Sequence, residues 1–319
     1  MNPMLICVSH SPIIMIRAKA PADEPKILAF YDECRRAIAD YAPEQVIVFG
    51  TDHFSGFHYS LMPAFCVGLK AGAVDDVGGF PGALRVPAED ALKLVGQLRA
   101  EGFDPAVSWD MRIDHGFSQP LQRLLGGLDL FPTIPIFIGA LSPPFLPFAR
   151  SRHYGAAVGR HVRESGKRTL LLGSGGLSHH PTRYYPLMGA AEPDVDAWQM
   201  HGEAGGSMSS EVWFSRLRRM HEEGAVMLTD GRRTPADIRL NEEIDRGFLD
   251  ELMSGNLGVV DAWTPETLVE RAGVGFLEVH TWIAAAAAHA AAGGGLPGKS
   301  IYSPTLEYGI GYGMVLATH

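Results

Sequence analysis

The stretch MLICVSHSP, residues 4–12, decides the fold class, because a short apolar run ends there at a turn. Apolar runs of this length, bounded by turn residues, are typical of buried strands. The next such run is Gln45–Phe49, and between the two runs apolar side chains recur at helical spacing over Lys26–Tyr41, with Pro25 at the start. A strand, an amphipathic crossover helix and a second strand predict an α/β sheet protein.

The rest of the chain continues this alternation. Ile134–Ile138 and Thr169–Leu172 are two further predicted strands, and Ala88–Ala100 is a second predicted helix. Beyond residue 190 a polar stretch precedes helical patterns over Leu240–Gly255 and Pro265–Ala292. We therefore expect one compact domain over residues 1–319, with a central, mostly parallel or mixed sheet flanked by helices and a helical C-terminal part. These late helices form either a cap on the sheet or its outer layer.

Composition and charge exclude several classes of protein. The 319 residues include 27 Lys and Arg against 36 Asp and Glu, a net charge of −9, and no basic run stands out. Nucleic acid and anionic membranes are therefore not expected partners. The three cysteines show no CxxC spacing, which fits a reducing cytoplasm. The N-terminus lacks a signal-peptide pattern, and Trp282 to Ala292 is shorter than the roughly 20 residues of a membrane span, so we expect a cytoplasmic protein.

Several of the thirteen histidines follow the predicted strands closely. His10 follows the first strand, His53 the second, and His179 follows Thr169–Leu172, while His115 lies in a loop-like stretch before a helix. Ligands of open α/β sheets bind outside the carboxyl ends of the strands. We therefore expect these histidines to converge on one cleft. The alternative for each is an ordinary loop or capping residue.

Histidines without cysteines indicate a particular chemistry. Imidazole and carboxylate ligands suit Fe(II), Zn(II) or Mn(II), and two histidines with one carboxylate are typical of non-haem iron oxygenases. Four histidines leave two for proton transfer near neutral pH. The sequence contains no HExxH motif and no GxSxG motif, which disfavours a zinc protease and a serine hydrolase. The glycine-rich turn GSGGLS, residues 173–178, serves either to bind phosphate or to let the backbone approach a cleft closely.

Four segments in this order, VSHSP, TDHF, DHGFSQPL and GSGGLSH, resemble the class III extradiol ring-cleavage dioxygenases. The resemblance covers most of the chain, including LEVHTW at residues 277–282, and is weaker from Met188 to Asp237. It implies one α/β domain that holds Fe(II). By resemblance, the metal ligands and the acid–base pair are assigned residue by residue: His10, His53 and Glu278 to the metal, His179 as base and His115 as acid.

The resemblance also implies the reaction and its partners. The expected reaction is extradiol cleavage by O2 of a catechol with a carboxylated side chain, most closely 3-(2,3-dihydroxyphenyl)propionate or 2,3-dihydroxycinnamate, in a homo-oligomer. The alternatives are another monocyclic catechol, of the protocatechuate or gallate type, or a non-catalytic metal-binding or interaction protein of the same fold. The presence of both His115 and His179 favours catalysis.

The roles of other residues stay open at this stage. Asp114 either orients His115 or tunes its pKa, or else it forms a turn. His180 has no assigned role. The remaining histidines are expected to be structural or solvent-facing: His58, His153, His161, His201, His221, His280, His289 and His319. The residue that binds the substrate carboxylate cannot be ranked among Arg112, Arg183, Arg216, Arg218 and Arg219.

Glu278 is preferred to Glu266 as the third ligand. Glu266 follows Thr264-Pro265, where an acidic residue favours the start of a helix for structural reasons. Glu278 lies in an apolar helical run, where a buried carboxylate is costly unless it is paired or bound to a metal. The alternative is that Glu278 lies on a solvated stripe of the helix with His289.

Overall fold

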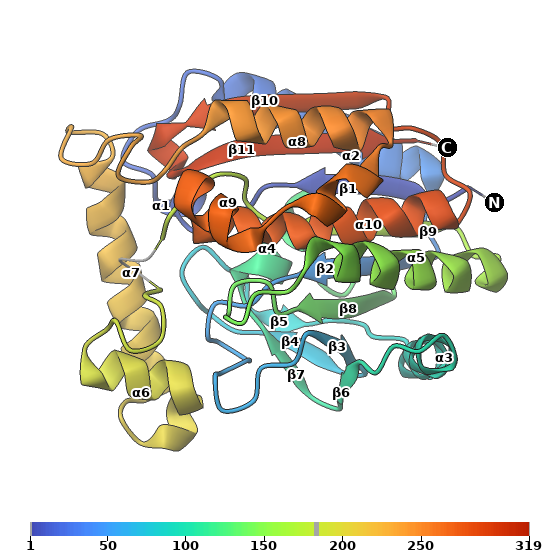
Figure 1. The fold of residues 1–319 in the computed structure, drawn as a ribbon, viewed down its shortest axis with the longest axis horizontal. Coiled ribbons are helices and arrows are strands. Elements are labelled where there is room, and N and C mark those ends of the chain that lie inside the picture. The colour runs from blue at the N-terminus through green and yellow to red at the C-terminus, as the bar shows by residue number, and fades with distance from the viewer. Residues whose placement is uncertain (1, 182–184, 319) are drawn as a thin grey trace.

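The computed structural model describes residues 2–181 and 185–318. Its central sheet is built from eight strands: β1 (Met4–Val8), β2 (Gln45–Gly50), β3 (Phe65–Gly68), β6 (Ala106–Ser108), β8 (Thr133–Ile138), β9 (Thr169–Ser174), β10 (Lys299–Thr305) and β11 (Ile310–Ala317). Their order across the sheet is β10-β11-β1-β9-β2-β8-β3-β6 (Figure 1). The sheet is mixed, as expected for this fold class.

The centre of the sheet is parallel. Strand β9 pairs in parallel with both β1 and β2, and β2 pairs in parallel with β8. Strands β11 and β3 run antiparallel to their neighbours β1 and β8. Because β1, β9 and β2 run in one direction, their carboxyl ends meet at one edge of the sheet. The segments that carry His10, His53 and His179 all begin at this edge.

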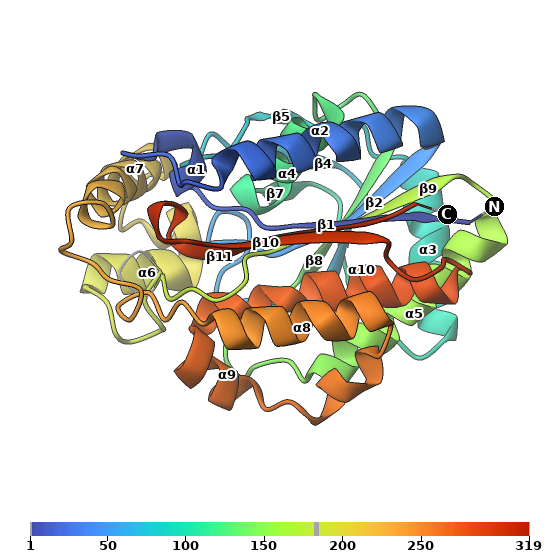
Figure 2. The ribbon, with the colours of Figure 1, turned by 90° about the horizontal axis from the view of Figure 1, so that it is seen from above.

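Two layers of helices cover the two faces of the sheet. Both faces are apolar, because side chains alternate between them along each strand and those on each side are apolar. In β1, Met4, Ile6 and Val8 belong to one buried cluster, whereas Leu5 and Cys7 belong to the other. Figure 2 shows the helices on the two faces. The first face carries α2 (Glu24–Tyr41) and α4 (His115–Leu125), and the second carries α3 (Ala88–Ala100), α5 (Phe148–Ser165), α8 (Glu242–Ser254) and α10 (Val279–Ala291).

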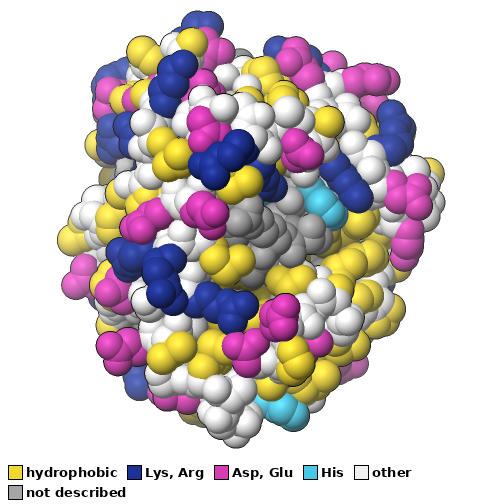
Figure 3. Space-filling model, turned by 90° about the vertical axis from the view of Figure 1, so that its left-hand side faces the viewer, with side chains coloured by type: hydrophobic (Ala, Val, Ile, Leu, Met, Phe, Trp, Pro, Cys, Tyr) yellow, Lys and Arg dark blue, Asp and Glu magenta, His cyan; other side chains and the backbone are white. Residues whose placement is uncertain are grey.

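The remaining elements lie around this core. A three-stranded sheet of β4 (Ala71–Ala73), β5 (Gly82–Ala83) and β7 (Met111–Ile113) flanks α4. At the end of the molecule where the chain leaves β1, the short helix α1 (Ile13–Ile16) packs against α7 (Ser210–Met227), and α6 (Pro193–His201) lies beside α7 (Figure 1). Figure 3 looks onto this end and shows basic, acidic and apolar side chains intermixed.

The structure confirms each strand predicted from the sequence and the helices over Lys26–Tyr41, Ala88–Ala100 and Leu240–Gly255, divides one predicted helix, and places His115 in the first turn of α4 and not in the loop before it. The predicted helix Pro265–Ala292 is divided into α9 (Pro265–Ala272), a 3-10 turn (Val274–Glu278) and α10, because Gly273 has a φ of +85° that ends the first helix. Several elements were not predicted from the sequence, among them β3, β6, α5, α6, α7, β10 and β11. Helices α8 and α10 form an outer layer, whereas α6 and α7 cover the end of the sheet. Among the described residues, no helix is long and apolar enough to cross a membrane.

Helices α5 and α10 pack so closely that glycine is needed between them. A Cβ atom on Gly155 would lie 2.1 Å from the carbonyl oxygen of Ala284, and one on Gly159 would lie 2.2 Å from that of Ala288. Both contacts are with backbone, which cannot move aside cheaply. The alanine-rich run of α10 therefore packs directly against two glycines of α5.

We predict that Gly155→Ala lowers the free energy of unfolding by about 1–3 kcal/mol, because the added methyl group overpacks this interface. The matched control is Gly96→Ala in α3, where an added Cβ meets no atom within 4 Å. This control should raise the free energy of unfolding by about 0.5–1 kcal/mol. Urea unfolding followed by circular dichroism measures both. Equal shifts in the two variants would contradict the packing argument.

Candidate active site and metal centre

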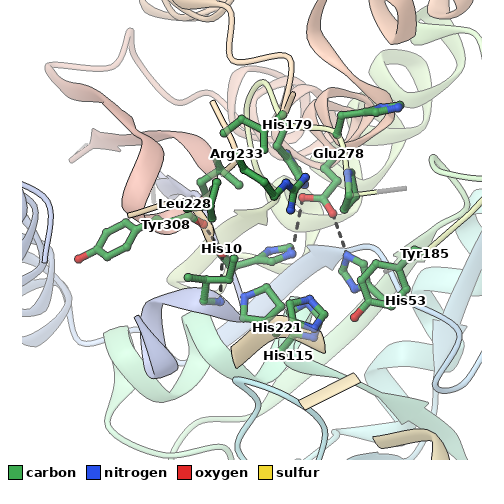
Figure 4. Close-up of a pocket in the computed structure, with 18 residues that line it drawn as sticks. His10, His53, His115, His179, Tyr185, His221, Leu228, Arg233, Glu278 and Tyr308 are labelled. Atoms are coloured by element: carbon green, nitrogen blue, oxygen red, sulfur yellow. Dashed lines mark hydrogen bonds and ion pairs between the residues drawn. The ribbon is translucent and has the colours of Figure 1, made fainter. Parts of the chain in front are cut away.

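The five residues singled out by the sequence line one pocket at the carboxyl edge of the sheet. His10 follows β1, His53 follows β2, His179 follows β9, His115 begins α4, and Glu278 precedes α10. Figure 4 shows their side chains pointing toward one another. The expectation of one shared cleft is therefore confirmed for these side chains.

Glu278 lies between two histidine rings. Its Oε1 is 3.0 Å from Nε2 of His53, and its Oε2 is 3.5 Å from Nε2 of His10. The Glu278 side chain is 1% exposed, so the solvated stripe considered as an alternative is excluded. Both Glu266 and Glu270 are exposed on α9, away from this pocket.

The outer hydrogen bonds of the two rings fix which nitrogen faces Glu278. Ser174 Oγ donates to the carbonyl of Gly116, so it accepts from Nδ1 of His10 at 2.9 Å. The carboxylate of Asp114 accepts from Nδ1 of His53 at 3.1 Å and from its backbone N–H at 2.6 Å. With the proton on Nδ1 in each ring, both Nε2 lone pairs point at the carboxylate.

This arrangement fits a bound metal ion. A buried carboxylate that faces two imidazole lone pairs needs a cation or added protons between them. Burial by itself would lower the pKa of His53, but the carboxylates of Asp114 and Glu278 outweigh it and raise this pKa well above its ordinary value. Burial would raise the pKa of Glu278, and the contacts with His10 and His53 hold it well below its ordinary value. Nitrogen and carboxylate donors of this kind suit divalent iron, zinc or manganese.

His115 lies against the same centre and is held by a different carboxylate. Its ring stacks on that of His53, with centroids 4.3 Å apart. Its Nδ1 is 2.5 Å from Oδ2 of Asp76, and its Nε2 is buried without a hydrogen-bond partner among the described residues. Burial, followed by the charge on His53, lowers the pKa of His115 well below its ordinary value. The Nε2 atom is thus aimed at the pocket and available to a ligand there.

Asp114 does not orient His115, which was one of the roles considered for it from the sequence. Asp114, its neighbour in the chain, caps α4 by accepting from the backbone N–H of Gly116 at 2.9 Å and also holds His53. Asp76, which orients His115, received no role from the sequence. No local pattern marks Asp76, because its contact with His115 spans 39 residues of chain.

His179 is fixed by its own turn. Its Nδ1 donates to the carbonyl of Leu177 at 2.7 Å, which leaves the lone pair on Nε2. A Cβ on Gly275 would lie 2.2 Å from this ring, and one on Gly176 would lie 2.5 Å from it. The glycine-rich turn therefore serves close backbone approach, the second of the two uses considered for it. Burial lowers the pKa of His179, so the ring is neutral at neutral pH.

The segment after residue 180 supplies three pocket residues that sequence reasoning missed: Tyr185, His221 and Arg233. Tyr185 stands 5.2 Å from His53 between ring centroids, and His221 is buried on α7. Of the arginines considered for the substrate carboxylate, Arg183 lies outside the described residues, and the other four do not line this pocket: Arg112, Arg216, Arg218 and Arg219.

The remaining histidines are divided between the core and the surface. His280 and His289 are buried and His153 and His201 are exposed, as expected of structural or solvent-facing residues. His58 and His161 are half-buried, and His319 lies outside the described residues. His180 lines the rim of the pocket, where its Nδ1 accepts from the backbone N–H of Val274 at 3.4 Å.

Comparison with known proteins assigns the class of this fold and site. Residues 4–311 match the family described as the catalytic LigB subunit of aromatic ring-opening dioxygenase. The chain belongs to this family, and its activity is that of an oxidoreductase that opens aromatic rings with O2. The resemblance to class III extradiol dioxygenases is thereby confirmed.

Particular relatives are similar along nearly their whole length. The chain is 38% identical to a protein of Rhodococcus jostii (strain RHA1), with 99% of this chain and 98% of the relative covered. It is 37% identical to a protein of Paraburkholderia xenovorans (strain LB400), over 97% and 93% of the two chains. A protein of Azotobacter vinelandii is 36% identical over 99% of each. All three are named 2,3-dihydroxyphenylpropionate/2,3-dihydroxicinnamic acid 1,2-dioxygenase.

Three overlapping sets of buried donors fit a metal ion. Two of them share His10 and His53 and add either Glu278 or His115, whose ligand atom lies within 4.8 Å of those of the two histidines; the third is Asp76, Asp114 and His115. Asp114 supports His53, which belongs to both of the first two sets, whereas Asp76 supports only His115, so the contact of Asp76 distinguishes these two sets.

We predict that Asp114→Asn weakens metal binding by about 10–100-fold, because His53 loses the acceptor that orients it. Asp76→Asn, an equally buried carboxylate on the neighbouring ring, should leave metal affinity unchanged. Titration of the metal-stripped protein with Co²⁺, followed by visible absorption, measures both. Equal weakening in Asp76→Asn would mean that His115, and not Glu278, completes the ligand set.

Proposed function

We propose that the protein is an Fe(II)-dependent extradiol dioxygenase whose substrate is a catechol with a carboxylated side chain. The preferred substrate is 3-(2,3-dihydroxyphenyl)propionate, and 2,3-dihydroxycinnamate is a second one. The observation that carries the proposal is one pocket with two kinds of histidine. Two rings face a buried carboxylate, and two others turn Nε2 to the same space. The names of the relatives support the choice of substrate.

In this proposal His10, His53 and Glu278 hold the ferrous ion. Three protein ligands on one side leave open positions for both oxygens of a catechol and for O2. The bound metal supplies orientation of the two reactants and a path for electron density from ring to oxygen. Both atoms of O2 enter the product, so no reducing cofactor is required.

His179 acts as the base. A catechol has to lose its phenolic protons when both of its oxygens coordinate a metal. The Nδ1 proton of His179 is held by the carbonyl of Leu177, so its Nε2 lone pair is the accepting site. Because burial lowers its pKa, His179 is neutral at neutral pH and ready to accept.

His115 acts as the acid. Its Nε2 accepts the second phenolic proton and later returns it to the oxygen that departs when the O–O bond breaks. Asp76 keeps the ring in place through Nδ1 and stabilises the charge that the proton brings. The stacking of the His115 ring on that of His53 supports this role, because it sets the proposed proton donor beside a proposed metal ligand. His179 thus removes one phenolic proton, whereas His115 holds the second and delivers it during ring cleavage.

The direct test is ring cleavage by protein that has been loaded anaerobically with Fe(II). On exposure to air, 3-(2,3-dihydroxyphenyl)propionate should give a yellow ring-opened product with one O2 consumed per substrate, and labelled O2 should place both atoms in the product. Removal of the metal with a chelator should abolish turnover, and added Fe(II) should restore it. Full turnover by metal-stripped protein, or cleavage between the two hydroxylated carbons, would overturn the proposal.

The acid–base roles have a separate test. His115→Gln and His179→Gln should each lower kcat by ~10²–10⁴, the usual contribution of a positioned acid or base, with iron content near that of the wild type. His153→Gln is the control, because His153 is exposed and lies outside the pocket. Iron content measured by a colorimetric chelator separates the outcomes. Collapse of iron stoichiometry in either variant would make that histidine a ligand.

A further inference from the structure

The pocket is lined by one cationic side chain that the acid–base chemistry does not use. Arg233, in the segment after α7, lines the pocket and is only 9% exposed. Among the described residues that line the pocket, it is the one Lys or Arg. Its backbone N–H donates to the carbonyl of Met227 at 2.9 Å, which fixes the segment to the end of α7.

Apolar side chains lie beside Arg233. Ile13, Leu228 and Ile238 line the same pocket and belong to one buried apolar cluster. Figure 4 shows Arg233 and Leu228 on one side of the site and His53 and Tyr185 on the other. The pocket therefore combines a wall that suits methylene groups with a buried guanidinium group.

We propose that Arg233 binds the carboxylate of the substrate side chain and thereby determines the preference for carboxylated catechols. The inference rests on the proposed function, since it concerns the substrate of that site. A guanidinium group binds a carboxylate through two parallel hydrogen bonds, and burial strengthens such a pair. The methylene groups of a propionate side chain pack against Leu228 and Ile238, while the catechol ring lies toward the histidines.

The other described arginines do not meet these conditions. Arg216 and Arg218 lie on α7 and do not line the pocket. Arg112 and Arg219 are exposed and lie outside the pocket. Arg232, the neighbour of Arg233, is exposed and paired with Asp230 at 2.7 Å. Arg232 therefore provides a matched control one residue away.

The experiment compares two substrates in the wild type and three variants. The substrates are 3-(2,3-dihydroxyphenyl)propionate and 3-propylcatechol, which lacks the carboxylate. In Arg233→Met, kcat/KM for the first should fall about 10–100-fold, as expected for loss of a charge-assisted pair, while kcat/KM for the second stays within about twofold of the wild-type value. Arg232→Met should change neither. Arg233→Lys, which retains the charge without the planar fork, should be intermediate.

A binding measurement gives a readout that does not depend on iron. Calorimetry with metal-free protein and 3-phenylpropionate, which has no phenolic hydroxyls, should show weaker binding to Arg233→Met by a similar factor. The neutral analogue 3-phenylpropan-1-ol should bind both proteins equally. Circular dichroism checks that each variant is folded. If Arg233→Met does not fold, the role of Arg233 is tested by two other results: the substrate preference of Arg233→Lys and the preference of the wild type between the two catechols.

The outcomes separate this inference from the proposed function. Wild-type protein that cleaves both catechols with equal kcat/KM would overturn the role of Arg233 while the dioxygenase activity stands. Equal losses on both substrates in Arg233→Met would also overturn it, because Arg233 would then be structural. Absence of cleavage of any catechol by iron-loaded wild type would refute the proposed function, and the binding of 3-phenylpropionate would still test Arg233.

Discussion

The buried carboxylate of Glu278, facing the Nε2 atoms of His10 and His53, is the interaction on which the rest of the structure depends. Placing a charge at this depth is costly unless a cation or a shared proton compensates it. The charge is compensated only if three segments meet at one point: the segment after β1, the segment after β2 and the segment before α10. The backbone accommodates this closely: a Cβ on Gly175 would lie 2.6 Å from the carbonyl oxygen of Glu278, and the N–H of Gly176 donates to its carboxylate.

Hydrogen bonds behind the rings orient the four histidines of the pocket in the same way. Ser174, Asp114, Asp76 and the carbonyl of Leu177 each bind one Nδ1 atom, so every ring presents Nε2 to the pocket. Two of these Nε2 atoms meet Glu278, and two do not. In our proposal the same residue type serves metal binding and proton transfer in one site, because position relative to the carboxylate, and not side-chain chemistry, separates the roles.

The pocket is assembled from two parts of the fold with different origins. The four histidines and Glu278 come from the edge of the sheet, from α4 and from the start of α10, all of which pack against the two apolar cores. The opposite wall comes from the region of α7 and the turn after it, which supplies His221, Leu228 and Arg233. This region is where the resemblance in sequence is weakest. A rigid reaction centre combined with a more variable wall is a physical basis for shared chemistry on differing substrates.

The sequence alone determined the features that depend on local periodicity. Strands β1, β2, β8 and β9 and helices α2 and α3 follow from apolar runs and helical spacing, and strand ends located the histidines that meet in the pocket. Glu278 was found through its apolar surroundings together with the family motif. Strands β10 and β11 were not predicted from the sequence, because Pro304, Gly311 and Gly313 interrupt the apolar pattern. Pairing with β1 stabilises β11, and this pairing is not visible in the sequence.

Only the tertiary structure decided which groups act on each other across the chain. Asp114 is adjacent to His115 in sequence, but its extended backbone turns its side chain toward the first turn of α4 and toward His53. The contact between Asp76 and His115 spans 39 residues, and Arg233 reaches the pocket through the packing of α7 at the end of the sheet. Such contacts arise from the folding of distant segments onto one another. They leave no periodic signal in the sequence, because periodicity reports which face of an element is buried and not what that face meets.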